Sequence, residues 1–402
     1  MTLAEELTWR GFVNQTTFTD ITDVNEPRTL YIGVDPSADS MTIGNFASMM
    51  MVRHFLDYGH KVIFLVGGAT GMIGDPDGKK QERDLRDRAT VDKSVEGLRG
   101  QIHKLFSGKS FEVVDNSDWF RDINYIDFLH SVGKHVSMTQ LLDRDFVQQR
   151  IGEGGSGISY AEFSYSLIQG YDFLHLYREK GVTLQLAGAD QWGNGLTGVS
   201  LVRKLAGGEA HVYTTPLVIN KQTGVKFGKS EGGAVWLDAA KTSPYKFYQF
   251  WLNIDDETSE SSIKMYTLLN REDVESLIDR HRQNPGSREL QKTLAYEVTR
   301  LVHGDDRARA VQRSSDFLFG AEQVALDSEV VDVLSEELPV QQVGTSVVEA
   351  LVSSGFTKSK GEARRLIEGG AVSVNGKKTF SDQSIEQKSL IKKGKNSFIL
   401  VI

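Results

Sequence analysis

The sequence contains no cysteine, which excludes disulfide frameworks, thiolate zinc sites and cysteine nucleophiles. Proline is scarce, at 7 of 402 residues, and charged residues make up 25% of the chain, as is typical of folded globular proteins. Long apolar runs and a basic-then-apolar start are also missing, so we expect no membrane insertion and no secretion. A cytoplasmic location follows as the expectation.

Most of the chain carries more negative than positive charge. The formal net charge is −8, but residues 340–402 contain ten Lys or Arg against five Asp or Glu. The tail therefore carries +5 and residues 1–339 about −13, so that any contact with nucleic acid is expected to involve the tail.

The first ~220 residues show the pattern of an open parallel sheet. Two β-rich runs, Leu30–Val34 and Lys61–Val66, enclose a stretch with apolar residues at helical spacing, namely Ile43, Phe46, Ala47 and Met50. A second strand-to-helix pair is predicted at Thr183–Leu186 and Leu196–Leu205. Ligands of such sheets lie at the carboxyl ends of the strands, which directs attention to residues 33–45, 67–80 and 188–194.

The chain is longer than one ordinary domain, and five parts are predicted. They are a Rossmann-like α/β domain at 1–222, a loop and connection at 223–242, a helical domain at 243–320, a linker at 321–339 and a small α+β module at 340–402. The last part is predicted from helices at Ser346–Gly355 and Lys358–Gly369, a Val372–Val374 strand with an Asn375-Gly376 turn, and a closing strand at Ser397–Val401.

Two segments could bind phosphate. In PSADSMTIGN, at residues 36–45, Thr42 and Asn45 share one face of the first turn of a helix whose N–H groups attract anions. Plain helix capping by Asp39 or Ser40 is the alternative. In KFGKS, at residues 226–230, two lysines on a loop could close over a polyphosphate, although such loops are usually solvated surface.

A polar stripe lies in an otherwise apolar helix at Tyr165, Gln169 and Asp172, which share one face at positions i, i+4 and i+7. Burying these groups is costly unless something hydrogen-bonds to them, and a ligand with an amino group and a hydroxyl would do so. A stripe that faces solvent is the alternative.

Together these segments resemble the class I aminoacyl-tRNA synthetases. PSADSMTIGN is similar to their HIGH-type signature and KFGKS to their KMSKS-type signature. The segments LYIGVDPSADS, LVGGATGMIGDP, FSYSLIQGYDF, DQWGN, TSPYKFYQFW and VTRLVHG resemble the bacterial tyrosyl enzymes specifically. The basic tail resembles their last, S-four type RNA-binding module, so that the resemblance covers essentially the whole chain.

The resemblance implies a tyrosine-tRNA ligase that binds ATP with Mg²⁺, L-tyrosine and tRNA(Tyr), uses no prosthetic group or resident metal, and forms a homodimer without a membrane contact. The implied tyrosine site is Tyr31 and Asp172 for the phenol, Asp75, Tyr165 and Gln169 for the ammonium group and Gln191 near the carboxylate. The implied ATP site is Gly33, Asp35, Gly44, Gly188, Asp190 and Lys229, with Asp190 on the ribose. The implied catalytic set is Ser37, Thr42, Asn45, Lys79, Arg83, Lys226, Lys229 and Ser230. A basic patch for the RNA backbone is expected from Lys358, Lys360, Arg364 and Arg365, with a solvated helix face as the alternative.

The chain departs from the family pattern at several positions. Thr42 and Asn45 stand where the HIGH signature has two histidines, and Ser37 stands where threonine is common. Ile32 occupies a position where the family often has cysteine, and Ala187 and Ala189 replace glycine and serine before DQWGN. Besides an active enzyme with a variant signature, two alternatives therefore stay open: a synthetase-like RNA-binding or regulatory protein that has lost catalysis, and a tryptophanyl relative.

Overall fold

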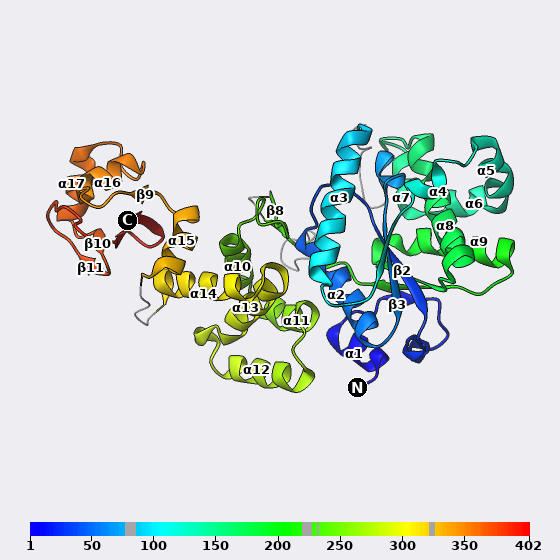
Figure 1. Cartoon of the computed structure of the whole chain (residues 1–402), viewed down its shortest axis with the longest axis horizontal. Helices are drawn as coiled ribbons and strands as arrows, with labels where there is room; N and C mark the ends of the chain where they lie inside the picture. Colours follow the sequence, from blue (N-terminus) through cyan, green and yellow to red (C-terminus); the bar gives the residue numbers. More distant parts are fainter. Residues whose placement is uncertain (77–85, 219–226, 231–232, 321–325) are drawn as a thin grey trace. The chain divides into compact units, whose positions relative to one another are not determined.

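The computed structural model describes residues 1–76, 86–218, 227–230, 233–320 and 326–402, with the backbone alone at 145, 146, 229 and 230. Contacts group the chain into two units (Figure 1). One unit comprises residues 1–242 and 254–294, and the other comprises residues 243–253 and 295–402. Among the described residues, no helix is long and apolar enough to cross a membrane.

The first unit is built on a six-stranded sheet with the order β1-β6-β5-β2-β3-β4. Its strands are β1 (Gln15–Thr16), β2 (Thr29–Val34), β3 (Lys61–Val66), β4 (Glu112–Asp115), β5 (Leu184–Gly188) and β6 (His211–Thr215). Strands β2 to β6 run parallel, which confirms the predicted parallel sheet. The edge strand β1 is antiparallel to β6, a difference that arises because β1 precedes the first βαβ unit and no crossover fixes its direction.

Strand order reverses between β2 and β5, which is the feature that places a ligand site in such sheets. From β2 the chain proceeds outward through β3 and β4, whereas β5 pairs on the other side of β2 and leads to β6. A crevice opens outside the carboxyl ends of the two strands at such a reversal. Those ends are Val34 and Gly188, next to the segments that the sequence singled out.

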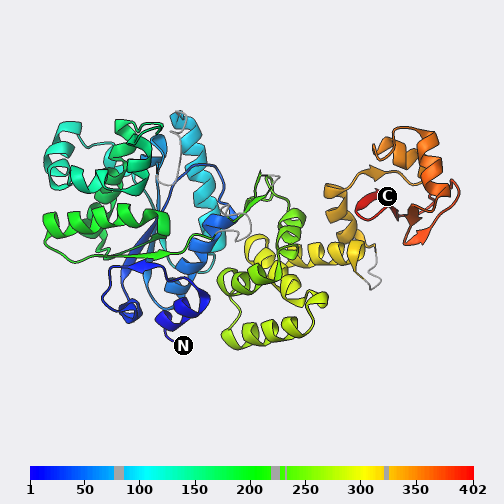
Figure 2. The same ribbon diagram turned by 180° about the vertical axis from the view of Figure 1, so that it is seen from behind.

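Helices cover both faces of this sheet (Figures 1 and 2). The helices of this unit up to residue 206 are α1 (Leu3–Arg10), α2 (Ile43–Asp57), α3 (Arg88–Leu105), α4 (Ser117–Phe120), α5 (Tyr125–Ser131), α6 (Met138–Leu142), α7 (Asp145–Ile151), α8 (Tyr160–Lys180) and α9 (Trp192–Ala206). The predicted helical residues Ile43, Phe46, Ala47 and Met50 all lie on the buried face of α2. This unit also contains α11 (Asp256–Tyr266) and α12 (Arg271–Gln283). The buried Arg10 guanidinium ties α1 to the end of α11, because it donates to the carbonyl oxygens of Lys264, Thr267 and Leu269.

The second unit contains the C-terminal module. Its elements are α10 (Pro244–Leu252), α14 (Asp305–Phe319), α15 (Ser328–Glu337), β9 (Val340–Gln341), α16 (Val347–Ser353), α17 (Lys360–Glu368), β10 (Val372–Val374), β11 (Lys377–Lys378), β12 (Ser389–Lys393) and β13 (Ser397–Val401), while α13 (Glu289–His303) begins in the first unit. The predicted turn is confirmed, since Asn375 and Gly376 both adopt positive φ values between β10 and β11. The five-stranded sheet has the order β11-β10-β12-β13-β9, and apolar residues of α16 and α17 pack with those of its strands in one core.

The expected linker at 321–339 is wrong for residues 328–337, which form α15. Asp327 caps this helix, and its apolar residues Val330 and Leu334 pack with Leu390 and Leu400 of the C-terminal sheet. Four valine or leucine residues at helical spacing make the segment part of a core rather than a solvated connection. The remaining predicted boundaries stay predictions, and contacts place residues 254–294 of the expected helical domain with the first unit.

Candidate active site

A cavity of about 370 Å³ opens at the carboxyl ends of β2 and β5, within the first unit. Fourteen of the predicted site residues line it: Tyr31, Gly33, Asp35, Ser37, Thr42, Gly44, Asn45, Asp75, Tyr165, Gln169, Asp172, Gly188, Asp190 and Gln191. They come from strands β2 and β5 and the segments directly after them, the start of α2, the loop after β3, and α8, which are far apart in the sequence. The structure thus brings the predicted tyrosine residues, and the predicted ATP residues apart from Lys229, into one cavity.

The side chains of Tyr31 and Asp172 are almost fully buried, at 1% exposure each. Tyr31 lies on β2 with its ring packed edge-on against Phe173, and its hydroxyl has no hydrogen-bond partner among the described residues. Burial raises the pKa of this phenol, and the nearby Asp172 carboxyl adds to the shift. A buried hydroxyl that has no partner within the protein can form a hydrogen bond with a polar group of a ligand.

Two residues that the sequence reasoning missed hold the Asp172 carboxyl. Asn116 Nδ2 donates to its Oδ2 at 3.2 Å, and Trp119 Nε1 donates to its Oδ1 at 2.9 Å. Burial raises the pKa of Asp172 to about 8, and these two hydrogen bonds act in the opposite direction. Asn116 directly follows strand β4, so its place at the carboxyl end of a parallel strand was the one signal that could have identified it.

The polar stripe on α8 points into the cavity, so the alternative of a solvent-facing stripe is wrong. Tyr165 is buried, and its hydroxyl donates to Asp35 Oδ1 at 3.3 Å. Burial raises the pKa of the Tyr165 phenol, and the carboxyls of Asp35 and Asp75 add to the shift. Gln169 Oε1 is buried without a partner among the described residues. These carboxylate, phenol and amide oxygens suit an ammonium group, which has donors only.

Gln191, which was expected near the carboxylate of the substrate, contacts the side chain of Asp75. Its Nε2 donates to Asp75 Oδ2, and its Oε1 accepts from Asn194 Nδ2 at 3.1 Å. Gln191 is therefore held in a fixed orientation at the wall of the cavity.

The outer part of the cavity has room for a larger group. A β-carbon built on Gly33 would meet no atom within 4 Å, so this glycine at the end of β2 leaves the space before it open. On the neighbouring strand a β-carbon on Gly188 would lie 2.8 Å from Asp190 Oδ1, so a side chain there would push the Asp190 carboxylate aside. The backbone of both strands is thus accessible to a ligand between Gly33 and Asp190.

Thr42 and Asn45 lie at the start of α2, as predicted. Asn45 Oδ1 accepts from the Thr42 backbone N–H at 3.0 Å and from its hydroxyl at 2.9 Å. The N-cap is Thr42, so the alternative of capping by Asp39 or Ser40 is wrong. Asp39 lies four residues before the first helical residue, Ile43, and forms an ion pair with Lys241.

The predicted residues Lys79, Arg83 and Lys226 lie outside the described residues, as do the side chains of Lys229 and Ser230. The backbone of Lys229–Ser230 forms strand β7, which pairs with β8 (Gly233–Ala234). Phe227 and Gly228 line the cavity, so the KFGKS segment reaches the site. In the second unit, all four predicted tRNA-binding residues are exposed on or just before α17: Lys358, Lys360, Arg364 and Arg365.

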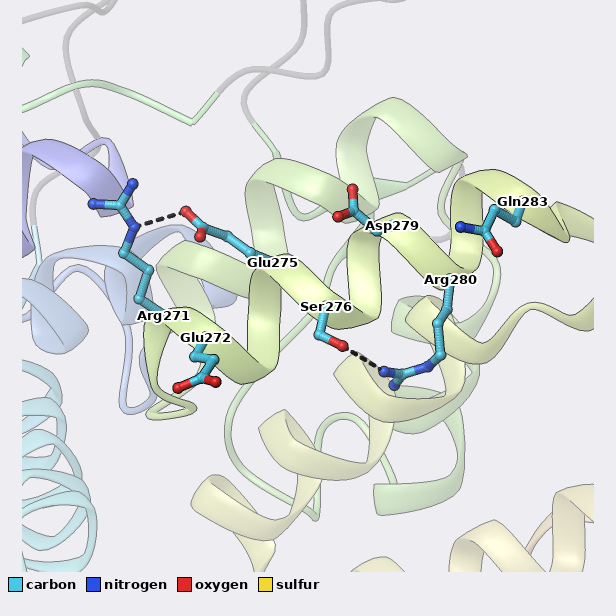
Figure 3. A pocket seen from close by; sticks show the side chains of 7 residues that line it. All are labelled: Arg271, Glu272, Glu275, Ser276, Asp279, Arg280 and Gln283. Atoms are coloured by element: carbon cyan, nitrogen blue, oxygen red, sulfur yellow. Dashed lines mark hydrogen bonds and ion pairs between the residues drawn. The ribbon is translucent and has the colours of Figure 1, made fainter.

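A second hollow, on helix α12, is a charged surface rather than a site (Figure 3). Two pairs of its side chains contact each other: Arg271 Nε lies 2.7 Å from Glu275 Oε1, and Arg280 donates to Ser276 Oγ at 2.9 Å. Exposed pairs of this kind contribute little to stability and give no enclosed space to a ligand.

Comparison with known proteins agrees with the geometry. A family model described as tRNA synthetases class I (W and Y) matches residues 22–320, and one described as the tyrosine–tRNA ligase SYY-like C-terminal domain matches residues 329–401. The chain is 42% identical to a tyrosine–tRNA ligase of Bacteroides fragilis, covering 100% of both chains, and 41% identical to one of Flavobacterium psychrophilum, covering 99% of this chain and 96% of that one. A C-terminally truncated mitochondrial tyrosyl-tRNA synthetase of Aspergillus nidulans superposes with a TM-score of 0.71 at 28% identity, covering 79% of this chain and 94% of that one.

Proposed function

The chain belongs to the class I tRNA synthetases of the W and Y family, and we propose that it is a tyrosine–tRNA ligase whose amino-acid site is the cavity around Tyr31 and Asp172. It uses ATP to convert L-tyrosine to tyrosyl-adenylate and pyrophosphate. It then transfers the tyrosyl group to the 3′-terminal adenosine of tRNA(Tyr). The supporting observation is the pair of buried polar groups at the inner end of the cavity, a hydroxyl and a carboxyl. A phenol hydroxyl can both donate and accept and so can bond to both groups, whereas an indole N–H can only donate.

Recognition of the amino acid divides between the two ends of the cavity. The substrate phenol donates to Asp172 and lies beside the Tyr31 hydroxyl, whose burial makes a missing partner costly. The ammonium group is held by Asp75, Tyr165 and Gln169, and Gln191 lies near the carboxylate. Phenylalanine leaves both inner groups unsatisfied, which is the physical basis of selectivity.

Adenylate formation needs no side-chain nucleophile. The tyrosine carboxylate attacks the α-phosphorus of ATP, the bond to the β-phosphate oxygen breaks, and pyrophosphate leaves. The nucleotide lies along Gly33, Asp35, Gly188 and Asp190, with Asp190 on the ribose. The rate then depends on holding the two reactants in line and on binding the transition state more tightly than the ground state.

Charge that develops on the pyrophosphate is stabilised by groups at the rim of the site. We assign this role to Ser37, in the segment after β2, and to Thr42 and Asn45 at the start of α2, where the proposed ATP-binding residue Gly44 also lies. We assign it also to Lys79, Arg83, Lys226, Lys229 and Ser230, whose side chains lie outside the described residues. ATP enters as its Mg²⁺ complex. Thr42 carries no positive charge, so lysines and the α2 N-terminus supply the stabilisation that a histidine would otherwise give.

The test is tyrosine-dependent exchange of labelled pyrophosphate into ATP by the folded protein. We expect exchange with tyrosine, and at most a trace with phenylalanine or tryptophan. Absence of exchange above background would favour the alternative of a synthetase-like protein without catalysis, and exchange driven by tryptophan would favour the tryptophanyl alternative.

We also propose that the chain acts as a homodimer in the cytoplasm, without a membrane contact. Large apolar side chains are exposed on neighbouring helices of the first unit: Tyr125, Ile126, Met138, Leu142, Ile151 and Tyr160. Exposed apolar side chains gathered in this way mark an interaction surface, and a self-complementary surface gives a two-fold dimer. Ile126→Glu should therefore yield monomers in light scattering, whereas Phe380→Glu, which alters an exposed apolar residue outside this segment, should not.

The basic side chains on and before α17 form the proposed contact with the tRNA backbone. Deleting residues 340–402 would test this poorly, because Leu390 and Leu400 cover the apolar face of α15. Replacing Lys358, Lys360, Arg364 and Arg365 together by alanine leaves that core intact, since all four are exposed. We expect a large loss of tRNA charging and an unchanged pyrophosphate exchange. Equal losses in both assays would contradict an RNA-specific role.

A further inference from the structure

Arg144 precedes helix α7 and does not line the cavity, yet it is linked to Asp75 through side-chain hydrogen bonds. Its Nη1 donates to Asn194 Oδ1 at 2.6 Å and to the Ser166 hydroxyl. Its Nη2 donates to the Gly193 carbonyl oxygen at 2.6 Å and to Thr197 Oγ1 at 2.7 Å. One guanidinium thus joins α8 to the first turn of α9.

Gly193 allows this approach. A β-carbon at Gly193 would lie 3.3 Å from Arg144 Nε and 3.4 Å from its Cζ, closer than side chains normally pack. The glycine of the DQWGN segment is therefore explained by the arginine that lies against it.

A chain of hydrogen bonds leads from Arg144 to the cavity, and each donor in it points toward the cavity. Asn194 is 2% exposed, and its Oδ1 accepts from Arg144 and also from the Ser166 hydroxyl at 2.6 Å. Its Nδ2 therefore points to Gln191 Oε1, and Gln191 Nε2 then points to Asp75 Oδ2. An arginine side chain can only donate, whereas an amide can present either end, so Arg144 decides which way both amides are turned.

We propose that Arg144 is a positioning residue for tyrosine activation, which fixes the orientation of Gln191 and Asp75 through Asn194. This inference rests on the proposed function, in which Asp75 and Gln191 bind the ammonium and carboxylate ends of tyrosine. Without Arg144, Asn194 loses a charged donor and can turn over. Gln191 then presents the wrong end to Asp75, and the amino-acid site loses its fixed geometry while the nucleotide side is unaffected.

The experiment compares Arg144→Ala, Arg144→Lys and Asn194→Ala with the wild type in pyrophosphate exchange. We expect the KM for tyrosine to rise about 10-fold or more in Arg144→Ala, which corresponds to one buried hydrogen-bonding group left unsatisfied, and the KM for ATP to stay within about twofold. Arg144→Lys should lie near Arg144→Ala, because an ammonium group cannot reproduce a planar fork that reaches four acceptors. The double variant of Arg144 and Asn194 should lose less than the two single losses combined.

Lys204→Ala is the matched control. Lys204 is also on α9 and donates to the His135 carbonyl oxygen at 2.8 Å, but it makes no contact with the chain of hydrogen bonds described above. Its tyrosine KM should equal that of the wild type. Tyrosine affinity measured by calorimetry without ATP, together with melting temperatures, separates lost positioning from lost folding, and Asn194→Ala gives the same readouts if Arg144→Ala does not fold.

The experiment separates a failure of the positioning role from a failure of the proposed function. A wild-type protein without tyrosine-dependent exchange would contradict the proposed function. An active wild type with an unchanged tyrosine KM in Arg144→Ala, or with equal changes in the tyrosine and ATP constants, would overturn the positioning role alone. Strictly additive losses of Arg144→Ala and Asn194→Ala would overturn it as well.

Discussion

Replacing Asp172 by Asn tests the proposed phenol site with the smallest change in shape. In the folded protein the carboxyl accepts from Asn116 Nδ2 and Trp119 Nε1, and the substrate hydroxyl would be its third donor. An asparagine amide has one acceptor oxygen, and its NH₂ group can only donate. At least one of the three donors must then face another donor.

The size of the effect follows from burial. Asp172 is 1% exposed, so water cannot replace the lost acceptor. A buried donor left without an acceptor costs about 1–3 kcal/mol, and each 1.4 kcal/mol is a factor of ten. We expect kcat/KM for tyrosine to fall about 5-fold to 150-fold. Phenylalanine has no hydroxyl to lose, so discrimination between the two amino acids should shrink by the same factor.

The assay is pyrophosphate exchange with tyrosine and with phenylalanine, for wild type and variant under the same conditions. Asp115→Asn is a suitable control, because Asp115 is a buried carboxyl beside Asn116 that accepts from the backbone N–H groups of Gly68 and Ser117 instead of facing the cavity. Equal losses for both amino acids in Asp172→Asn would refute the reasoning, because they would mean that the carboxyl supports the fold and does not read the substrate.

Three further predictions follow from the same site. Gly33→Val should raise the KM for ATP about 10-fold or more while leaving tyrosine affinity unchanged, since the side chain would fill open space at a strand end; an unchanged ATP constant in kinetic assays would move the nucleotide elsewhere. Lys229→Ala should slow adenylate formation about 100-fold in single-turnover measurements with tyrosine affinity nearly intact, and loss of tyrosine binding would contradict a role limited to the transition state. Burial raises the pKa of Asp172 from 3.8 to about 8, so the folded protein favours the protonated carboxyl. The contribution of this group to the free energy of unfolding is therefore fully present below about pH 4 and is lost as the pH rises through 8. Asp172→Asn should then stabilise the unliganded protein more at pH 8.5 than at pH 5, by up to about 4 kcal/mol in calorimetry, and an equal shift at both pH values would contradict this.

Local patterns predicted a large part of the fold and the site. The strands at 30–34 and 61–66, the buried face of α2 and the Asn375-Gly376 turn depend on residues close in sequence, so periodicity and turn chemistry were sufficient. The shared face of Tyr165, Gln169 and Asp172 followed from helical spacing in the same way. Where the prediction failed, as for α15 in the expected linker, its apolar face is covered by strands more than fifty residues later in the chain, which no local pattern reveals.

By itself, the sequence determined which residue types the protein offers for tyrosine and ATP, and on which helix or strand end most of them lie. Only the tertiary structure decided what holds them. Asn116, Trp119 and Arg144 reach the site because the order of the strands and the packing of α8 on α9 bring segments 20 to 60 residues apart within hydrogen-bonding distance. Such contacts depend on the path of the whole chain rather than on the spacing of neighbouring residues, and they fix the charge and orientation of the groups that bind the substrate.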